Sequence, residues 1–304
     1  MSRRIIITGI TGFVGSSLVK YFSKLDYTIL GISRNKPSPE IMGLLTEWYQ
    51  ADLSIQCPKL ICDTVIHCAG LASDSANTLD HFTHNTRSTQ ITYDALICKQ
   101  FIFISSASVY ENMKGELKED VVNGSNCVSA YARSKYQAEQ FLLSQNMESK
   151  RVVILRPRAI YGPNDSVLLP KLLKLSIAKR IQLVMGNAEF NTSLTHIVKL
   201  SKAIEQFIMN HKQGIYNVCD DQTYFLKNVL LDIHEFKTGK KPFQLRLNVT
   251  LLRAWVNLSE RFKIKSSLST KSIQYLTEPC VLNIDKLKTE FPLLESPGFS
   301  RNEL

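Results

Sequence analysis

Short apolar runs alternate with helical patterns along the first half of the chain. The runs that predict buried strands are residues 5–8, 28–32, 64–67, 101–105 and 152–155. After the first run, apolar residues recur at helical spacing at Val14, Leu18, Phe22 and Leu25. Strands that alternate with helices pair in parallel. The pattern therefore predicts the α/β class, with a doubly wound parallel sheet between helices.

The turn after the first strand is rich in glycine. Gly9, Gly12 and Gly15 recur at every third position between that strand and the first helix. Gly9 permits a tight turn, Gly12 leaves room for a pyrophosphate, and the helix beyond offers unpaired N–H groups and a positive dipole end. This order of elements predicts a Rossmann-type dinucleotide site. Its candidate contacts are Gly9, Thr11, Gly12, Phe13, Val14 and Gly15.

The end of the second strand bears on which dinucleotide binds. An acidic residue there holds the 2′-hydroxyl of NAD, and a basic residue accepts the 2′-phosphate of NADP. Ser33 and Arg34 stand at this point, and a hydroxyl with a guanidinium suits a phosphate. The sequence therefore favours NADP, with NAD still open because Arg34 can equally be a solvated loop residue.

A serine, a tyrosine and a lysine form the candidate catalytic group. Ser106 follows the strand at 101–105, at the sheet edge where ligands of open α/β folds bind. Tyr131 and Lys135 stand four residues apart, on one face of a predicted helix. A free phenol has a pKa of about 10, and a nearby ammonium favours the phenolate.

These three side chains suit hydride transfer at a secondary alcohol. Ser106 would hold the substrate oxygen while its proton moves to or from Tyr131 and a hydride moves to or from a nicotinamide ring. Lys135 would lower the pKa of the phenol and bind the nicotinamide ribose. Ser106, Tyr131 and Lys135 are the predicted catalytic residues, and the last two are also predicted cofactor contacts.

Several motifs together indicate a family. They are the glycine-rich turn, Asp52-Leu53, the run from His67 to Leu71, Asn85 with Thr89, the strand end from Ser105 to Tyr110, Tyr131 with Lys135, and the run from Arg156 to Pro163. Through them, residues 3–163 resemble the extended short-chain dehydrogenases/reductases of the NAD-dependent epimerase/dehydratase family, which includes UDP-galactose 4-epimerase. The interval of 25 residues from Ser106 to Tyr131 also fits the epimerases.

The resemblance implies further cofactor contacts. Asp52 and Leu53 would meet the adenine, and Asn85 would lie on the cofactor side of the site. The pyrophosphate and ribose region of the cofactor would contact the backbone of Cys68, Ala69, Gly70 and Leu71. Arg158, in the last motif, is taken as a cofactor contact on the same ground. Asp52 as a strand cap and Asn85 as a turn residue remain structural alternatives.

Departures from the family pattern bear on reaction and substrate. Dehydratases carry an Asp-Glu pair after the catalytic Ser or Thr, whereas this chain has Ala107 and Ser108, so elimination is disfavoured. We expect an NAD(P)-dependent epimerase or ketoreductase acting on a nucleotide-activated sugar, and the NADP-like strand end slightly favours the ketoreductase. The family's diphosphate-clamping Arg is replaced by Asn191 and Thr192, and a loop Lys by Ala72.

Two other functions stay open. One is a redox sensor that binds NAD(P) without catalysis, although such relatives commonly lose the Tyr or Lys that this chain keeps. The other is a reductase of a lipid-like alcohol at a membrane surface.

The second half of the chain is less regular. Residues 167–177 predict a helix and residues 181–185 a short strand, and residues 193–198 resemble the family segment that returns to the nucleotide domain. We expect residues 1–163 to form the NAD(P)-binding Rossmann domain. Residues 164–304 would form mainly a smaller substrate-binding lobe, with segments around 193–220 returning to the Rossmann core. The resemblance also suggests a homodimer through the helices that bear Asn85 and Tyr131.

Composition narrows the class of protein. Of 304 residues, 44% are hydrophobic and 21% charged, which excludes disordered and collagen-like chains. Seven cysteines without a Cys-x-x-Cys pair predict no metal site and a reducing compartment. No stretch approaches the roughly 18 apolar residues of a membrane span, and Thr8 and Gly9 interrupt a signal-like start. We therefore expect a cytoplasmic protein.

The net charge of +10 predicts an anionic partner. No nucleic-acid-binding module is recognisable, so an anionic small molecule is the expected partner and nucleic acid is not. Basic residues crowd the C-terminal third, at Lys237, Lys240, Lys241, Arg246, Arg253, Arg261, Lys263, Lys265 and Lys271. Among them, Leu251, Trp255, Leu258 and Phe262 recur at helical spacing. We expect this stripe to be the core face of a lid helix, with a membrane-surface helix as the alternative.

Overall fold

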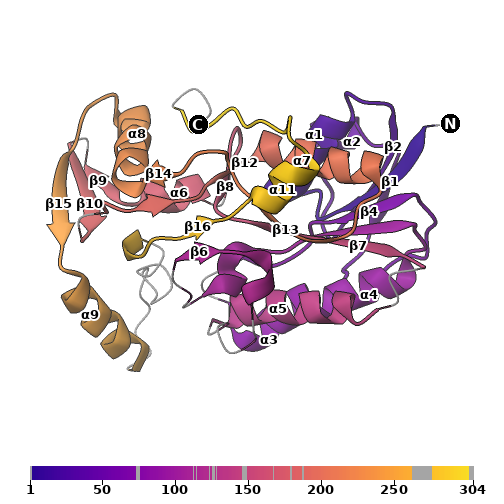
Figure 1. The fold of residues 1–304 in the computed structure, drawn as a ribbon, viewed down its shortest axis with the longest axis horizontal. Coiled ribbons are helices and arrows are strands. Elements are labelled where there is room, and N and C mark those ends of the chain that lie inside the picture. Colours follow the sequence, from indigo (N-terminus) through magenta and orange to yellow (C-terminus); the bar gives the residue numbers. More distant parts are fainter. Residues whose placement is uncertain are drawn as a thin grey trace.

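The computed structural model describes residues 2–300 except 73–75, 112, 114, 123, 125, 126, 128, 146–148, 167, 179, 187 and 262–275. A central sheet of seven parallel strands has the order β13-β7-β5-β4-β1-β2-β3 (Figure 1). These strands are β1 (Arg3–Thr8), β2 (Tyr27–Ser33), β3 (Glu47–Gln50), β4 (Thr64–His67), β5 (Gln100–Ile104), β7 (Arg151–Pro157) and β13 (Gly214–Val218). The predicted doubly wound parallel sheet is confirmed.

Alternation along each strand explains why helices cover both faces of the sheet. In β1, Ile5 and Ile7 belong to one buried cluster and Ile6 to the other, because successive side chains of a strand point to opposite faces. The first cluster packs under α1 (Phe13–Phe22), α7 (Ile197–Asn210) and α11 (Asp285–Glu290). The second packs under α4 (Ser88–Ala95) and α5 (Ala130–Leu143), on the opposite side of the sheet (Figure 1).

Short helical segments complete this part of the fold. They are α2 (Pro39–Met42), α3 (Thr78–His81), the π-helix η1 (Phe82–Arg87), and the 3₁₀ helices η2 (Ala107–Tyr110) and η3 (Glu119–Val121). In the described part of the chain, no helix has the length and hydropathy needed to cross a membrane.

A second lobe has its own small sheet and core. Its elements are α6 (Leu168–Leu173), β9 (Ser176–Ala178), β10 (Ile181–Met185), α8 (Leu226–Thr238), β15 (Phe243–Leu247) and α9 (Val249–Arg261). The helix predicted at 167–177 is shorter than expected, because residues 176–178 pair with β10 as a strand. Leu172, Val184 and Leu230 are among the buried residues of the lobe core.

The stripe of apolar residues on α9 is not the core face of that helix. Val256 is fully buried in the lobe core, whereas Leu251, Trp255 and Leu258 are exposed. The expected lid-helix packing of these three residues is therefore wrong, because the helix uses its other apolar face, with Val249 and Leu252, to contact the lobe. Phe262 lies outside the described residues.

Paired two-residue strands connect the two parts of the molecule. They are β8 (Ile160–Tyr161) with β12 (Thr195–His196), β11 (Asn191–Thr192) with β14 (Tyr224–Phe225), and β6 (Glu116–Leu117) with β16 (Val281–Leu282). From β12 the chain runs through α7 into β13, which pairs with β7 of the central sheet. Leu287, Phe291 and Leu294 also pack in the core beside the sheet, a return that the sequence pattern did not predict.

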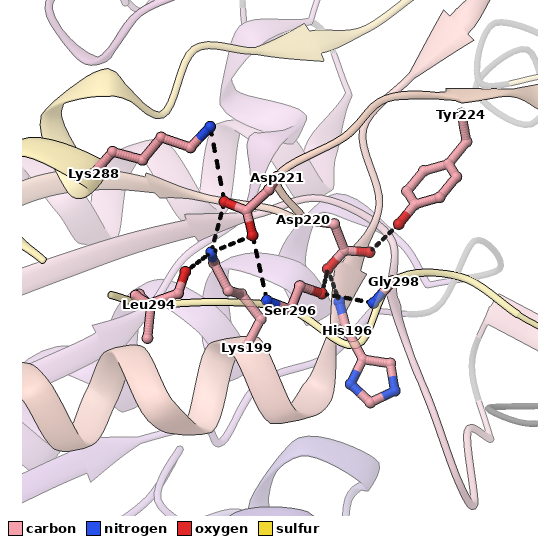
Figure 2. A network of polar contacts seen from close by, with 9 residues as sticks. All are labelled: His196, Lys199, Asp220, Asp221, Tyr224, Lys288, Leu294, Ser296 and Gly298. Atoms are coloured by element: carbon pink, nitrogen blue, oxygen red, sulfur yellow. Dashed lines mark hydrogen bonds and ion pairs between the residues drawn. The ribbon is translucent and has the colours of Figure 1, made fainter. Parts of the chain in front are cut away.

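A polar network fastens the C-terminal segment to this junction (Figure 2). Asp220 accepts hydrogen bonds from the His196 backbone N–H at 2.9 Å and from the Ser296 hydroxyl at 2.5 Å. Lys199 contacts both carboxylate oxygens of Asp221 at 3.0 Å and donates to the Leu294 carbonyl. His196 is thus a buried structural residue, and the same carboxylate of Asp220 accepts a hydrogen bond from the hydroxyl of buried Tyr161 at 2.6 Å. Tyr161 lies in the core of the second lobe.

Candidate active site

The carboxyl ends of the central strands border a cavity of about 600 Å³. Most of the residues predicted to bind the cofactor line it, namely Gly9, Thr11, Gly12, Ser33, Arg34, Asp52, Leu53, Cys68, Ala69, Gly70 and Leu71. Because this edge of a doubly wound sheet is where nucleotides bind, the cavity has the size and place that suit a dinucleotide.

The glycine-rich turn leaves this cavity open for a pyrophosphate. Gly9 has φ +69°, a left-handed conformation, and any Cβ there would lie 2.8 Å from the Ala69 backbone. A Cβ on Gly15 would lie 2.3 Å from the carbonyl oxygen of Gly9, so the third glycine lets α1 pack against the turn. Phe13 is buried in the core, and Phe13, Val14 and Gly15 do not appear in the described lining. The side chains of Phe13 and Val14 serve packing, and α1 still directs its N-terminus at the cavity.

A basic and an acidic side chain lie at the end of the cavity where the adenosine is predicted to bind. Arg34 is exposed and lies 4.0 Å from a carboxylate oxygen of Asp52. The Ser54 hydroxyl, at 2.6 Å, lowers the pKa of Asp52, and Arg34 adds to this effect. Ser33 is buried, and its hydroxyl donates to the Asn35 carbonyl at 2.7 Å. The only proton of that hydroxyl is therefore used within the protein, so Arg34 is the better placed of the two for a phosphate.

Asn85 organises the site from within the protein and does not line the cavity. It is fully buried in η1, where its amide bonds both the N–H of Leu71, at 2.7 Å, and the carbonyl of Leu71, at 3.1 Å. It also donates to the hydroxyl of Ser134 at 2.9 Å. Asn85 thus ties the cofactor loop to α5, and η1 fits the frequent occurrence of π-helical turns at functional sites.

Lys135, on α5, lies next to the Gly70 backbone that lines the cofactor cavity, and its own side chain is not part of the lining. Its Nζ donates to the Ile104 carbonyl at 2.9 Å, and a Cβ built on Gly70, which lines the cavity, would lie 3.3 Å from this nitrogen. The side chain is almost completely buried, and that burial lowers its pKa to about 8. Lys135 therefore brings a cationic donor next to the backbone that borders the cofactor.

Ser106 and Tyr131 line a second, smaller pocket of about 180 Å³. The Ser106 oxygen accepts from the Ser108 N–H at 3.1 Å, so its own proton can still be donated to a substrate. The ring of Tyr131 meets the edge of buried His81, with ring centroids 5.7 Å apart. Tyr131 and Lys135 lie one turn apart on α5, with Tyr131 on the second pocket and Lys135 next to the backbone that lines the cofactor cavity.

The loop of Ser106 is fastened to the helix of Tyr131. Glu111 accepts from the backbone N–H of Ser129 at 2.5 Å. Ser129 is the N-cap of α5, and its hydroxyl accepts from the Ala132 N–H at 3.1 Å. These bonds fix the start of α5 relative to η2, and they hold the serine hydroxyl and the phenol at one pocket.

Arg158 lies in this second pocket and not in the cofactor cavity, contrary to the prediction. It is buried, and its Nε donates to the Thr192 hydroxyl at 3.1 Å. The β7–β8 connection turns at Ala159, which has φ +48°, so Arg158 points toward β11. The guanidinium of Arg158 therefore lies beside Thr192, one of the two residues that replace the clamping Arg of the family.

A buried ion pair joins the elements that carry the predicted catalytic residues. Glu139, one turn after Lys135, accepts two bonds from Arg156, at 3.0 and 2.6 Å, and one from Ser105 at 2.5 Å. Arg156 also donates to the hydroxyl of Tyr110 at 3.0 Å. The network joins α5, β7 and the end of β5, so it fixes the spacing of Lys135 and Ser106.

Some residues that line the two cavities were not predicted from the sequence. In the cofactor cavity, Asp80 of α3, His84 of η1 and Ser88 of α4 lie at four-residue spacing. That polar spacing was visible in the sequence, but nothing there placed it at the sheet edge. In the second pocket, Glu278, Pro279 and Cys280 come from a segment far along the chain, and no motif marked them.

The fold and the site define the class of protein: an NAD(P)-dependent enzyme of the extended short-chain dehydrogenase/reductase type. The chain belongs to the NAD dependent epimerase/dehydratase family, whose sequence model matches residues 5–219.

Individual proteins resemble the chain to different extents. UDP-glucose 4-epimerase of Vibrio cholerae is 32% identical over 219 residues, which cover 66% of each chain. The decarboxylating sterol-4-alpha-carboxylate 3-dehydrogenase of Dictyostelium discoideum is 23% identical over 94% of each chain. The structure of UDP-glucuronic acid 4-epimerase from Bacillus cereus in complex with NAD superposes with a TM-score of 0.74 at 20% identity, covering 99% of this chain and 95% of that one. This last likeness concerns the fold alone.

Proposed function

We propose that the chain transfers hydride reversibly between a nicotinamide dinucleotide and a secondary alcohol or ketone of a nucleotide-activated sugar, as a ketoreductase or an epimerase. The observation that carries the proposal is the convergence of Ser106 and Tyr131 on one pocket, with Lys135 next to the Gly70 backbone that lines the dinucleotide cavity. Arg158 beside Thr192 supports an anionic substrate, because it supplies a cation at the place of the missing clamp.

The residues divide the chemistry between them. The bound dinucleotide supplies or accepts the hydride. Ser106 donates a hydrogen bond to the substrate oxygen and orients it toward Tyr131, which donates or accepts the proton of that oxygen. The Lys135 ammonium favours the phenolate form of Tyr131 by charge and holds the dinucleotide ribose. Ala107 and Ser108 carry no carboxylate for elimination of water.

A second candidate substrate is an uncharged, apolar ketone or alcohol. Glu111 and Glu278 place carboxylates on the pocket lining, where they would repel a diphosphate, and Met113, Leu117 and Pro279 make much of the rest apolar. The sterol dehydrogenase of Dictyostelium also matches this chain over nearly its whole length. The pocket therefore supports a reductase of a lipophilic ketone as the alternative.

We also propose a preference for NADP, which rests on exposed Arg34 and on the absence of an acidic residue at positions 33–35. Arg34→Ala is expected to lower the ratio of kcat/KM for NADPH to that for NADH by about tenfold or more, because a charge-assisted hydrogen bond contributes about 1.5–3 kcal/mol. Steady-state kinetics with both cofactors measure the ratio. Lys36→Ala, at an exposed neighbour, is the matched control. An unchanged ratio in Arg34→Ala would argue against the phosphate contact.

A panel of substrates tests the proposed function. Purified protein is incubated with the oxidised or the reduced form of each dinucleotide and with either nucleotide sugars or apolar ketones, and both the change in cofactor oxidation state and the sugar products are measured. We expect turnover with a nucleotide sugar. Turnover with apolar ketones alone would select the second candidate. A chain that binds the cofactor but neither consumes it nor inverts any sugar would behave as a redox sensor, and both candidates would be lost.

A further inference from the structure

Helix α9 presents apolar side chains to solvent. Leu251, Trp255 and Leu258 are 70%, 50% and 54% exposed. Their spacing of four and three residues places them on one face of the helix. Val256 on the other face is fully buried in the lobe core, so α9 is held firmly to the lobe by a different set of residues.

Most of the net positive charge of the chain lies in the sequence around this helix. Between residues 237 and 271 lie nine of the 37 Lys and Arg residues but one of the 27 Asp and Glu residues, Glu260. Of the described side chains in this stretch, those of Lys237, Lys240, Lys241, Arg246 and Arg253 are exposed. Such a stretch attracts a surface whose charge is uniformly negative.

The helix also adjoins the substrate pocket. Arg253 forms an ion pair with Glu278 at 2.8 Å, and Glu278 lines that pocket. In Figure 1, α9 follows β15 at the end of the lobe farthest from β1 and β2. A surface bound by α9 would therefore lie beside the pocket and away from the adenosine end of the cofactor cavity.

We propose that α9 binds the surface of an anionic lipid bilayer, with Leu251, Trp255 and Leu258 inserted at the level of the acyl chains and the basic residues against the headgroups. Interfacial helices combine an apolar face containing Trp or Leu with Lys and Arg. Tryptophan prefers this boundary because its ring is apolar and its N–H is polar. Three side chains on one helix make a small patch for a stable protein interface but a sufficient one for reversible binding to a bilayer.

Co-sedimentation of the full chain with vesicles tests the proposal. We expect binding to vesicles of phosphatidylcholine with phosphatidylserine, little binding to phosphatidylcholine alone, and weaker binding as salt is raised. The triple variant Leu251→Ser, Trp255→Ser, Leu258→Ser should bind at least tenfold more weakly. The triple variant Ile61→Ser, Ile97→Ser, Leu293→Ser removes equally exposed apolar side chains elsewhere and should bind as the native chain does.

Tryptophan fluorescence adds a readout at the helix itself. The chain has two tryptophans, Trp48 and Trp255. Emission should shift to the blue when anionic vesicles are added, and the shift should vanish in Trp255→Leu, which keeps an apolar side chain. Circular dichroism and dinucleotide binding, unchanged in every variant, show that the fold is intact and keep the result separate from the proposed catalytic function.

Three results would overturn the proposal. The first is that the native chain does not bind anionic vesicles, and the second is that the native chain and the α9 triple variant bind them equally. The third is that the native chain is a dimer, that the α9 triple variant is a monomer, and that neither binds vesicles. The last result would assign the face to a second copy of the chain.

Discussion

Tyr131→Phe is expected to lower kcat by about 10²–10⁴-fold and to leave dinucleotide affinity unchanged. The substitution removes one hydroxyl, the proposed proton donor and acceptor, and keeps the ring that packs against His81. Lys135 and the cofactor cavity stay as they are. Steady-state kinetics give kcat, and fluorescence titration with the dinucleotide gives its affinity.

A second tyrosine on the same helix serves as the control. Tyr136→Phe removes a hydroxyl from a residue that does not line either cavity, so kcat should stay within about twofold of the native value. If Tyr131→Phe turned over substrate as fast as Tyr136→Phe, the phenol would not be the proton carrier.

Arg156→Met is expected to destabilise the fold by about 3–5 kcal/mol, because it leaves the buried carboxylate of Glu139 without its bidentate partner. Both side chains are almost completely inaccessible to water, so solvent cannot replace the lost bonds. Urea unfolding followed by circular dichroism measures the change in the free energy of unfolding.

Two comparisons make this stability prediction specific. Lys99→Met breaks an exposed ion pair with Asp63 and should cost no more than about 1 kcal/mol. The double variant Arg156→Met, Glu139→Gln removes both charges, so it should be more stable than Arg156→Met alone. A loss below about 1 kcal/mol in Arg156→Met would show that the pair does not hold the site together.

Much of the fold could be predicted because short runs rich in apolar residues mark many of the strands. Residues 64–67 and 181–185 were predicted as strands with the bounds that β4 and β10 have. The glycine-rich turn was equally informative, since Gly9 and Gly15 meet backbone where any larger residue would clash. Ser106, Tyr131 and Lys135 were identifiable because helical spacing and the sheet edge bring their side chains to one region.

The remaining features depend on contacts that spacing along the chain does not encode. Arg158 was assigned to the cofactor, but the turn at Ala159 and the hydroxyl of Thr192 direct it to the other pocket. On α9, apolar residues occupy two faces, and the sequence pattern could not tell which face packs on the lobe. Residues 278–280 reach the pocket because β16 pairs with β6 and Cys280 bridges Thr192.

Transfer of deuterium tests the central claim, that this site moves hydride to a substrate carbon, most directly. The protein is incubated with NADPH that carries deuterium at the transferable position of the nicotinamide ring and with either the keto form of a nucleotide sugar or an apolar ketone, and the products are analysed by mass spectrometry and NMR. The account predicts a product with one deuterium at the former carbonyl carbon, formed by the native chain and lost in Tyr131→Phe. Cofactor that binds tightly and keeps its label with every substrate, or a labelled product that forms equally well in Tyr131→Phe, would contradict it.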